Sequence, residues 1–399
     1  MKQNQIPQSI EQIPEVVLHP QTVKHLKKGH PWITQDNFSD KFPDDFLIKY
    51  SKNNNSSIFI NDKNHKKVKA RLWANVKSTS KLNCFENDIE FRLKMAIEKR
   101  KKKFRRDNFY LCFGEADLLP GLFIQQLGKN ILIQTQCKFW ENFQENIINI
   151  IKNTILDMDN FWWQDRSTKK SFPHLVKNNQ KITGNEHYVI KEFGVKLAIF
   201  LGASYDHGIY TDMAAIRNKL IPLIRGQSLL NLYCYTGIFS LHALQQGFTK
   251  VKSVDISHKY LTQLEENILL NNFDLNNHES IEGDSLSVLQ KIIKDNQKFD
   301  FVICDPPTAS SDGKKLTNTF EVYPTLLSKI YKTLNHNGLA LLALNTHQIG
   351  IKKFEEMIIK NSPKDIQVIE RFKLSDDCPT LPYFPEGNYL KVILIKKNS

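Results

Sequence analysis

The first part of the chain alternates short apolar runs with clusters of polar turn residues. Apolar side chains concentrate at residues 46–50, 58–60 and 68–73, and the polar residues 53–57 interrupt the pattern as a solvated loop. Runs of this kind, rich in β-branched and aromatic residues, are typical of strands joined by turns. The pattern therefore predicts a small β-rich domain over residues 14–85.

A helix is predicted next, with Asp88 as its cap and Phe91, Met95 and Ala96 as its apolar stripe. Strands, an amphipathic helix and further strands follow it. The mixture predicts a central α+β domain over residues 86–190.

The pattern changes near residue 193, where strands begin to alternate with helices until the chain ends. This alternation is typical of a parallel sheet covered by helices. We therefore expect an α/β fold in which residues 191–399 form a Rossmann-like domain with a mostly parallel sheet.

Polar residues stand where the first four strands of this domain are predicted to end. Because the carboxyl ends of parallel strands meet at one edge of a sheet, their side chains are expected to lie close together. They are, in chain order, Asn231, Asp255, Asp284 and Asp305.

The turn after the first of these strands carries one glycine, Gly237, and lacks the G-x-G-x-x-G spacing of dinucleotide sites. Asp255, 18 residues later, is placed to accept both hydroxyls of a ribose. Asp284 is placed to meet the amino group of an adenine. An adenosine site without a phosphate cradle matches S-adenosylmethionine better than NAD.

Composition and charge limit the kinds of ligand and partner that the protein is expected to bind. The 399 residues carry a formal charge of +13, and the six cysteines are scattered without a metal-binding spacing, so no metal is expected. No apolar run is long enough for a membrane span and no secretory leader is visible, which predicts a soluble, cytoplasmic protein. The positive charge favours nucleic acid, although a bias toward Lys, Asn and Ile can also arise from an AT-rich genome.

The positive charge is concentrated in one block, because seven of the eight residues from 99 to 106 are cationic. The macrodipole of a helix accommodates one or two cations at its C-terminus, and this run exceeds that number. We expect it to contact RNA phosphates; a solvated helix face is the alternative. Its cationic residues are Lys99, Arg100, Lys101, Lys102, Lys103, Arg105 and Arg106.

Several motifs resemble those of one enzyme family. They are Gly-His-Pro-Trp-Ile at residues 29–33, Gly-Glu-Ala-Asp with Leu-Pro-Gly at 114–121, Asn231 to Phe239, and Pro-Glu-Gly-Asn-Tyr-Leu-Lys at 385–391. Together they are similar to the class I methyltransferases of large-subunit ribosomal RNA that carry an N-terminal PUA domain, and most similar to the 5-methylcytosine enzymes of that group. The resemblance implies a PUA domain, a central domain, a methyltransferase domain and S-adenosylmethionine as donor. It also implies that Asp212, Tyr233 and Asp305 contact this cofactor.

Two departures from the family pattern affect the expected chemistry. Met213 and Ala214 replace the expected Gln or His and Arg, and Asn345 stands where the cytosine enzymes have their catalytic cysteine. Carbon 5 of cytosine becomes nucleophilic only after a thiolate adds to the ring, whereas a base nitrogen needs only to be positioned. Residues 305–310 are also similar to those of the guanine-N7 branch of these enzymes. That branch has Asn at the position of Asn345. Cys304 and Cys378 are the alternative thiols.

The sequence thus predicts an S-adenosylmethionine-dependent RNA methyltransferase that modifies a base of large-subunit ribosomal RNA, at a nitrogen, by direct SN2 transfer. Asp305, Pro307 and Asn345 are expected to orient the base. The alternatives are a cytosine-C5 enzyme with a substituted nucleophile and a non-catalytic RNA-binding homologue. The oligomeric state stays open, with a homodimer as one option.

Overall fold

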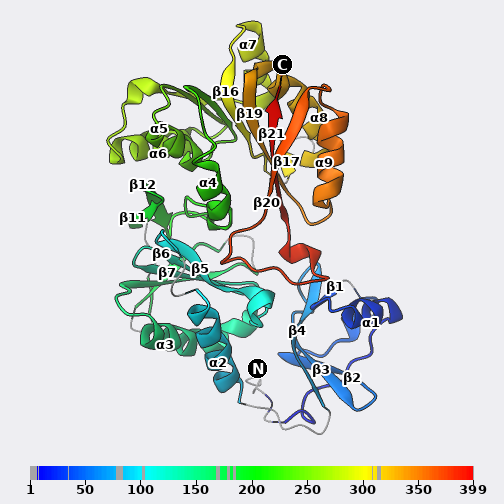
Figure 1. The fold of residues 1–399 in the computed structure, drawn as a ribbon. Helices are drawn as coiled ribbons and strands as arrows, with labels where there is room; N and C mark the ends of the chain where they lie inside the picture. Colours follow the sequence, from blue (N-terminus) through cyan, green and yellow to red (C-terminus); the bar gives the residue numbers. More distant parts are fainter. Residues whose placement is uncertain are drawn as a thin grey trace. The chain divides into compact units, whose positions relative to one another are not determined.

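The computed structural model describes residues 7, 9–34, 36–77, 84–100, 104–167, 171–177, 180–182, 186–307, 309–311 and 316–398. Contacts divide the chain into two compact units (Figure 1). Unit 1 comprises Met1–Glu186, Phe200–Tyr205 and Asp377–Gly387; unit 2 comprises His187–Ile199, Asp206–Asp376 and Asn388–Ser399. The sequence placed residues 191–399 in one domain, whereas the structure assigns Phe200–Tyr205 and Asp377–Gly387 to unit 1.

Unit 1 begins with an antiparallel sheet in the strand order β1-β4-β3-β2, preceded by helix α1. The predicted loop at residues 53–57 is in fact a tight hairpin turn: Asn53 and Asn54 adopt positive φ angles of 50° and 60°, which Asn tolerates, so β3 already begins at Asn55. The elements are α1 (Pro20–Lys27), β1 (Trp32–Thr34), β2 (Leu47–Lys52), β3 (Asn55–Asn61) and β4 (Val68–Lys77).

A second sheet of unit 1 has the order β10-β9-β8-β7-β6-β5, and helices α2 and α3 pack against each other and into its core (Figure 1). Its elements are α2 (Phe85–Glu98), β5 (Asn108–Phe113), β6 (Leu122–Leu127), β7 (Asn130–Thr135), α3 (Gln144–Thr154), β8 (Asn160–Asp165), β9 (His174–Lys177) and β10 (Gln180–Ile182). A separate domain boundary near residue 85 stays a prediction.

Helix α2 exists as predicted, but its buried face differs from the expected one. Phe91 and Met95 are 66% and 48% exposed, and the cap is Cys84 rather than Asp88. The stripe that reaches the core recurs every four residues and comprises Phe85, Ile89, Leu93 and Ile97. Ala96 is buried as expected.

Unit 2 contains a seven-stranded sheet in the order β15-β14-β13-β16-β19-β21-β20. Strands β15 to β19 in this order run parallel, and β21 and β20 complete the sheet with antiparallel pairings. This confirms the α/β class. The strands are β13 (Ser228–Leu232), β14 (Lys250–Asp255), β15 (His278–Glu282), β16 (Phe299–Cys304), β19 (Leu334–Asn345), β20 (Ile366–Phe372) and β21 (Leu390–Lys397).

Helices cover both faces of this sheet (Figure 1). Two short hairpins, β11 with β12 and β17 with β18, accompany them. The elements are β11 (Glu186–Glu192), β12 (Val195–Leu201), α4 (Ala214–Leu220), α5 (Ile238–Gln245), α6 (His258–Leu270), α7 (Ser285–Lys294), β17 (Ala309–Ser311), β18 (Leu316–Asn318), α8 (Thr319–Thr333) and α9 (Ile351–Lys360).

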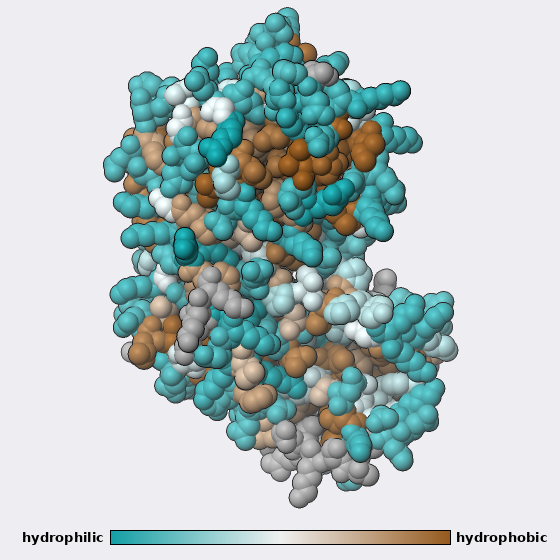
Figure 2. All heavy atoms as spheres, in the orientation of Figure 1, coloured by the Kyte–Doolittle hydropathy of each residue, from teal (hydrophilic) through white to brown (hydrophobic). Residues whose placement is uncertain are grey.

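The surface seen in Figure 2 is largely hydrophilic, with separate apolar areas. None of the helices in the described ranges combines the length and apolar composition needed to cross a membrane. Within the same ranges, no group of three or more His, Cys, Asp or Glu side chains is arranged to hold a metal ion.

Candidate active site

The strand order of unit 2 determines where a ligand can bind. The chain builds β13, β14 and β15 outward in one direction and then returns to place β16 on the other side of β13. Loops that leave adjacent strands in opposite directions open a crevice at the carboxyl edge of a parallel sheet. The candidate site is therefore the loops that follow β13, β14, β15 and β16.

The loop after β13 is held in an unusual backbone conformation. Tyr233, Tyr235 and Gly237 all have positive φ angles, of 57°, 51° and 80°. Such angles are costly for tyrosine, and they cluster at functional sites where surrounding contacts enforce them. Here the amide of Tyr235 donates to Oδ2 of Asp255 at 3.0 Å, which ties this loop to the end of β14.

Asp255 is oriented by backbone groups on both of its carboxylate oxygens. Besides the Tyr235 contact, Oδ1 accepts the amide of Ser257 at 2.9 Å. A carboxylate oxygen accepts more than one hydrogen bond, so both oxygens keep capacity for a ligand. The next residue, Ile256, leaves 75% of its side chain exposed. Ile256 was not among the predicted site residues; an apolar residue directly after a strand-end acid is the signal that could have identified it.

A second loop, residues 206–213, closes against the first. The amide of Gly208 donates to the hydroxyl of Tyr235 at 2.9 Å, and the hydroxyl of Thr236 donates to the Gly208 carbonyl at 2.6 Å. The ring of Tyr235 lies 5.3 Å from that of Tyr210 and 4.5 Å from that of Tyr260. The rings of Tyr210, Tyr235 and Tyr260 thus form an aromatic cluster next to Asp255. They were not among the predicted site residues.

Gly237 occupies a position that only glycine fits. It precedes α5 with a φ of 80°, and a Cβ there would lie 2.0 Å from Cδ1 of Leu264, a fully buried side chain of α6. The backbone angle and the close approach of α6 thus impose independent requirements.

Gly237→Ala is expected to destabilise the protein more than Gly247→Ala, which serves as the matched control. Gly247 has a φ of 86°, but a Cβ there meets nothing within 4 Å. The control should lose roughly 1–2 kcal/mol of unfolding free energy from the backbone alone. Gly237→Ala should lose about 1–3 kcal/mol more, from overpacking against Leu264. Urea unfolding measures both, and equal losses would show that Leu264 yields without cost.

Asp305 follows β16 directly and is half-buried. Burial and then the carboxylate of Asp212 raise its pKa to about 7, while Arg217 acts in the opposite direction. Asp212 in turn accepts the hydroxyl of Tyr389 through Oδ2 at 2.5 Å. Of the two prolines that follow, Pro306 is buried and Pro307 is exposed.

Asn345 is the last residue of β19, the strand next to β16, and it is exposed. The neighbouring residue Thr346 is fixed by two hydrogen bonds. The Thr346 amide donates to the carbonyl of Tyr389, the residue before β21, at 2.8 Å. The Thr346 carbonyl accepts from Nζ of Lys391, on β21, at 2.6 Å. The parallel pairing of β16 with β19 thus brings Asp305 and Asn345 to the same edge of the sheet.

Three predicted cofactor ligands make contacts within the protein. Asn231 is inside β13 rather than at its end, is buried, and donates to Oγ of Ser240 on α5 at 2.9 Å. The expectation that it stands at the end of the strand is therefore wrong, because alternation turns its side chain into the layer between sheet and helix. Asp284 caps α7, with Oδ2 accepting the amide of Ser287 at 2.9 Å. Tyr233 packs against the hydrophobic core of the sheet.

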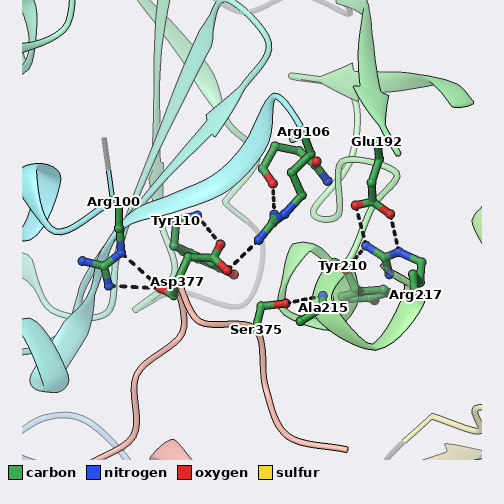
Figure 3. A network of polar contacts seen from close by, with 10 residues as sticks. Arg100, Arg106, Tyr110, Glu192, Tyr210, Ala215, Arg217, Ser375 and Asp377 are labelled. Carbon is green, nitrogen blue, oxygen red and sulfur yellow. Dashed lines mark hydrogen bonds and ion pairs between the residues drawn. The ribbon is translucent and has the colours of Figure 1, made fainter. Parts of the chain in front are cut away.

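Arg100 and Arg106 of the cationic run are buried in ion pairs, which contradicts their predicted contact with phosphates. In unit 1, Arg100 forms two hydrogen bonds with the carboxylate of Asp117. Figure 3 shows Arg100 donating to the backbone carbonyl of Asp377 and Arg106 paired with the Asp377 carboxylate, with Nη2 of Arg106 2.7 Å from Oδ1. Arg100 and Arg106 are only 4% and 8% exposed, so neither reaches a phosphate. Lys99 and Arg105 are exposed, and residues 101–103 lie outside the described residues.

The alternative thiols are both buried. Cys304 is 0% exposed within the sheet, and Cys378 is 2% exposed in unit 1. Burial raises the pKa of Cys304 far above its ordinary value, so its thiolate is strongly disfavoured.

Comparison with known proteins gives a consistent picture. A model of the S-adenosylmethionine-dependent methyltransferase family matches residues 177–396. The chain is 27% identical over 403 residues to "Ribosomal RNA large subunit methyltransferase I" of Salmonella choleraesuis (strain SC-B67), covering 95% of this chain and 96% of that protein. It is 28% identical over 316 residues to YwbD of Bacillus subtilis (strain 168), covering 77% and 79%.

Two solved structures share the fold. SMU.776 complexed with SAH superposes with a TM-score of 0.85 at 20% identity, covering 96% of this chain and 100% of that one. An S-adenosylmethionine-dependent methyltransferase from Agrobacterium tumefaciens gives a TM-score of 0.53 at 16% identity, covering 73% and 89%.

Proposed function

The chain belongs to the S-adenosylmethionine-dependent methyltransferase family, and from this premise we propose that it methylates a base of large-subunit ribosomal RNA, at a nitrogen. The observation that carries the proposal is the shared sheet edge of Asp255, Asp305 and Asn345, which provides a nucleoside site beside a polar base site. The names of the relatives and the charge of +13 support an RNA substrate. Such a substrate would place the protein in the cytoplasm.

The residues of the loops after β13 and β14 fit S-adenosylmethionine. Asp255, oriented by two amides, would accept the ribose hydroxyls, and the exposed side chain of Ile256 would pack on the adenine. Asp284 would accept the adenine amino group through the oxygen that does not cap α7. The bound cofactor supplies a methyl group activated on a sulfonium. The Tyr210, Tyr235 and Tyr260 rings would shield this cation, because aromatic faces attract positive charge.

A base nitrogen is the target that the side chains support best. Attack by a ring nitrogen or exocyclic amine uses a lone pair on the base itself, so the protein must only align it with the methyl group. The Asp305 carboxylate would accept an N–H of the base, and the Asn345 amide would pair with another edge atom. Among the described residues, the thiol adjacent to this site, Cys304, is fully buried and disfavours covalent C5 chemistry.

The proposal is tested with purified protein, large-subunit ribosomal RNA transcribed without modifications, and S-adenosylmethionine labelled in its methyl group. After digestion to nucleosides, mass spectrometry identifies the labelled product. A methylguanosine or methyladenosine, or cytidine methylated on nitrogen, would support the proposal. 5-Methylcytidine would contradict the nitrogen target, and cofactor binding without transfer would favour a non-catalytic RNA-binding role.

The rate of transfer is expected to rise as the pH increases through about 7, because the pKa of Asp305 lies there. Below this pH the carboxyl is protonated and loses part of its accepting capacity; above it the carboxylate is ionised. Asp305→Asn keeps the shape but cannot ionise. It should lower kcat roughly 10²-fold and remove this pH dependence, in line with the loss of one preorganised polar group.

Asp274→Asn is the matched control, since Asp274 is an exposed aspartate of unit 2 that caps a short 3₁₀ turn, and it should leave the pH profile unchanged. An Asp305→Asn enzyme with the wild-type kcat and pH profile would remove Asp305 from the proposed mechanism.

A further inference from the structure

Helix α1 in unit 1 is a cationic helix that packs on the core only through the partly buried Val23 and Leu26. Every side chain from Pro20 to Lys27 is at least partly exposed, and the helix contains no Asp or Glu. Its last turn and the residue after it present Lys24, His25, Lys27 and Lys28, all exposed. Here the cations reach solvent, in contrast to Arg100 and Arg106, which are neutralised by buried carboxylates.

The segment Asp377–Gly387 lies against this part of unit 1 and is fixed at both ends. At one end, the Asp377 carboxylate binds Arg106 and accepts the amide of Tyr110. At the other, the buried ring of Phe384 packs edge-on against Trp32 at 4.7 Å, and Glu386 pairs with His30 at 3.1 Å. The segment is thus held on unit 1 by a buried ion pair and an aromatic contact.

Tyr383, between these anchors, points its ring into solvent. It is 70% exposed although its backbone adopts a φ of 60°, which is costly for a bulky residue. A Cβ placed on Gly29 would lie 3.8 Å from Cδ2 of Tyr383, so the ring lies beside the turn that ends α1. The structure therefore holds an aromatic ring in solvent next to exposed lysines.

We propose that Tyr383 and the C-terminal turn of α1 form an RNA-binding surface on which an unpaired base of the substrate stacks on Tyr383 while Lys24, Lys27 and Lys28 contact the flanking phosphates. Aromatic rings beside cations are the combination that binds single-stranded RNA with little dependence on sequence. The segment holds two acids: Asp377 is buried and bound to Arg106, and Glu386 contacts Nε2 of His30 at 3.1 Å. The proposal rests on the proposed function, since it takes the substrate to be RNA.

The test measures the affinity of the full-length protein for a labelled single-stranded RNA oligonucleotide and for transcribed large-subunit ribosomal RNA, by fluorescence anisotropy or filter binding. Tyr383→Ala should weaken binding at least about fivefold through the lost stacking. The pair Lys27→Glu/Lys28→Glu should weaken it at least about tenfold at low salt and flatten the dependence of affinity on salt.

Matched controls come from the same unit. Phe91→Ala removes another exposed ring, and Lys66→Glu/Lys67→Glu makes the same charge change at two adjacent exposed lysines outside α1. Both controls should change affinity less than about twofold. Thermal unfolding and S-adenosylmethionine affinity, measured on every variant, should match those of the wild type.

Equal losses in Lys66→Glu/Lys67→Glu and Lys27→Glu/Lys28→Glu would overturn the site, because they would reveal only a general charge effect. Wild-type RNA affinity in Tyr383→Ala would also overturn it, and would leave the surface to a protein partner. The two proposals fail separately. If ribosomal RNA is not methylated but the Tyr383 and α1 variants lose RNA affinity, the surface stands and the proposed reaction fails.

Discussion

Replacing Asp377 with alanine is expected to lower the free energy of unfolding of unit 1 by roughly 3–5 kcal/mol, the range found when one partner of a buried ion pair is removed. The Asp377 side chain is fully buried, and its loss leaves the buried guanidinium of Arg106 and the amide of Tyr110 without this acceptor (Figure 3). Burial raises the pKa of Asp377 although Arg106 lowers it, so the pair is retained at a desolvation cost.

Tryptophan fluorescence is a selective probe for this experiment, because all five tryptophans of the chain belong to unit 1. Asp376→Ala, at the neighbouring exposed carboxylate, is the control and should change the urea midpoint little. An Asp377→Ala midpoint equal to that of the control would show that Arg106 finds another partner or reaches water.

Glu192→Gln is expected to have a comparable effect in unit 2, again roughly 3–5 kcal/mol. Glu192 accepts Nε and Nη2 of Arg217 at 2.5 and 2.9 Å, and neither side chain exceeds 1% exposure (Figure 3). Glutamine preserves the shape but removes the charge, so Arg217 stays buried without its counter-ion. Arg217 also donates to the Tyr210 carbonyl, so the loop beside the cofactor site should loosen and cofactor affinity should fall.

The control is Glu279→Gln, which weakens a partly exposed pair with Lys252 in the same unit and should cost about 0–1 kcal/mol. Urea unfolding followed by far-UV circular dichroism measures both variants. Similar losses of unfolding free energy in the two variants would show that the buried Glu192–Arg217 pair stabilises the protein no more than the Glu279–Lys252 pair does.

The same residue gives a pH dependence with a defined sign. Burial alone would raise the pKa of Glu192, but Arg217 and His242 outweigh it and hold the pKa well below its ordinary value of 4.5. The stabilisation is therefore present above pH 4.5 and is lost as the pH falls toward the lower folded-state pKa. The difference in stability between wild type and Glu192→Gln should shrink as the pH falls below 4.5.

The alternation of strands and helices after residue 193 was sufficient to predict the parallel sheet. It also placed Asp255 and Asp305 at strand ends, since strand periodicity and the position of the first polar residue are local properties of the chain. The prediction for Asn231 was wrong because β13 ends one residue later than expected. That difference turns the Asn231 side chain from the sheet edge into the layer beneath α5. The predicted buried face of α2 was also wrong, because apolar residues occupy more than one face of that helix and the sequence alone does not show which face meets the core.

The sequence by itself determined the fold class and the order of the strand-end acids, because both depend on patterns within a few residues. Only the tertiary structure decided the role of each charge. Arg106 resembles a phosphate ligand in sequence, yet it is neutralised by Asp377, 271 residues away. Tyr383 and Gly29 are even further apart in sequence, yet the segment anchored by Asp377 brings the ring beside the turn that ends α1. A charged side chain binds a ligand or supports the fold according to whether its partner is solvent or a buried counter-ion, and packing alone makes that choice.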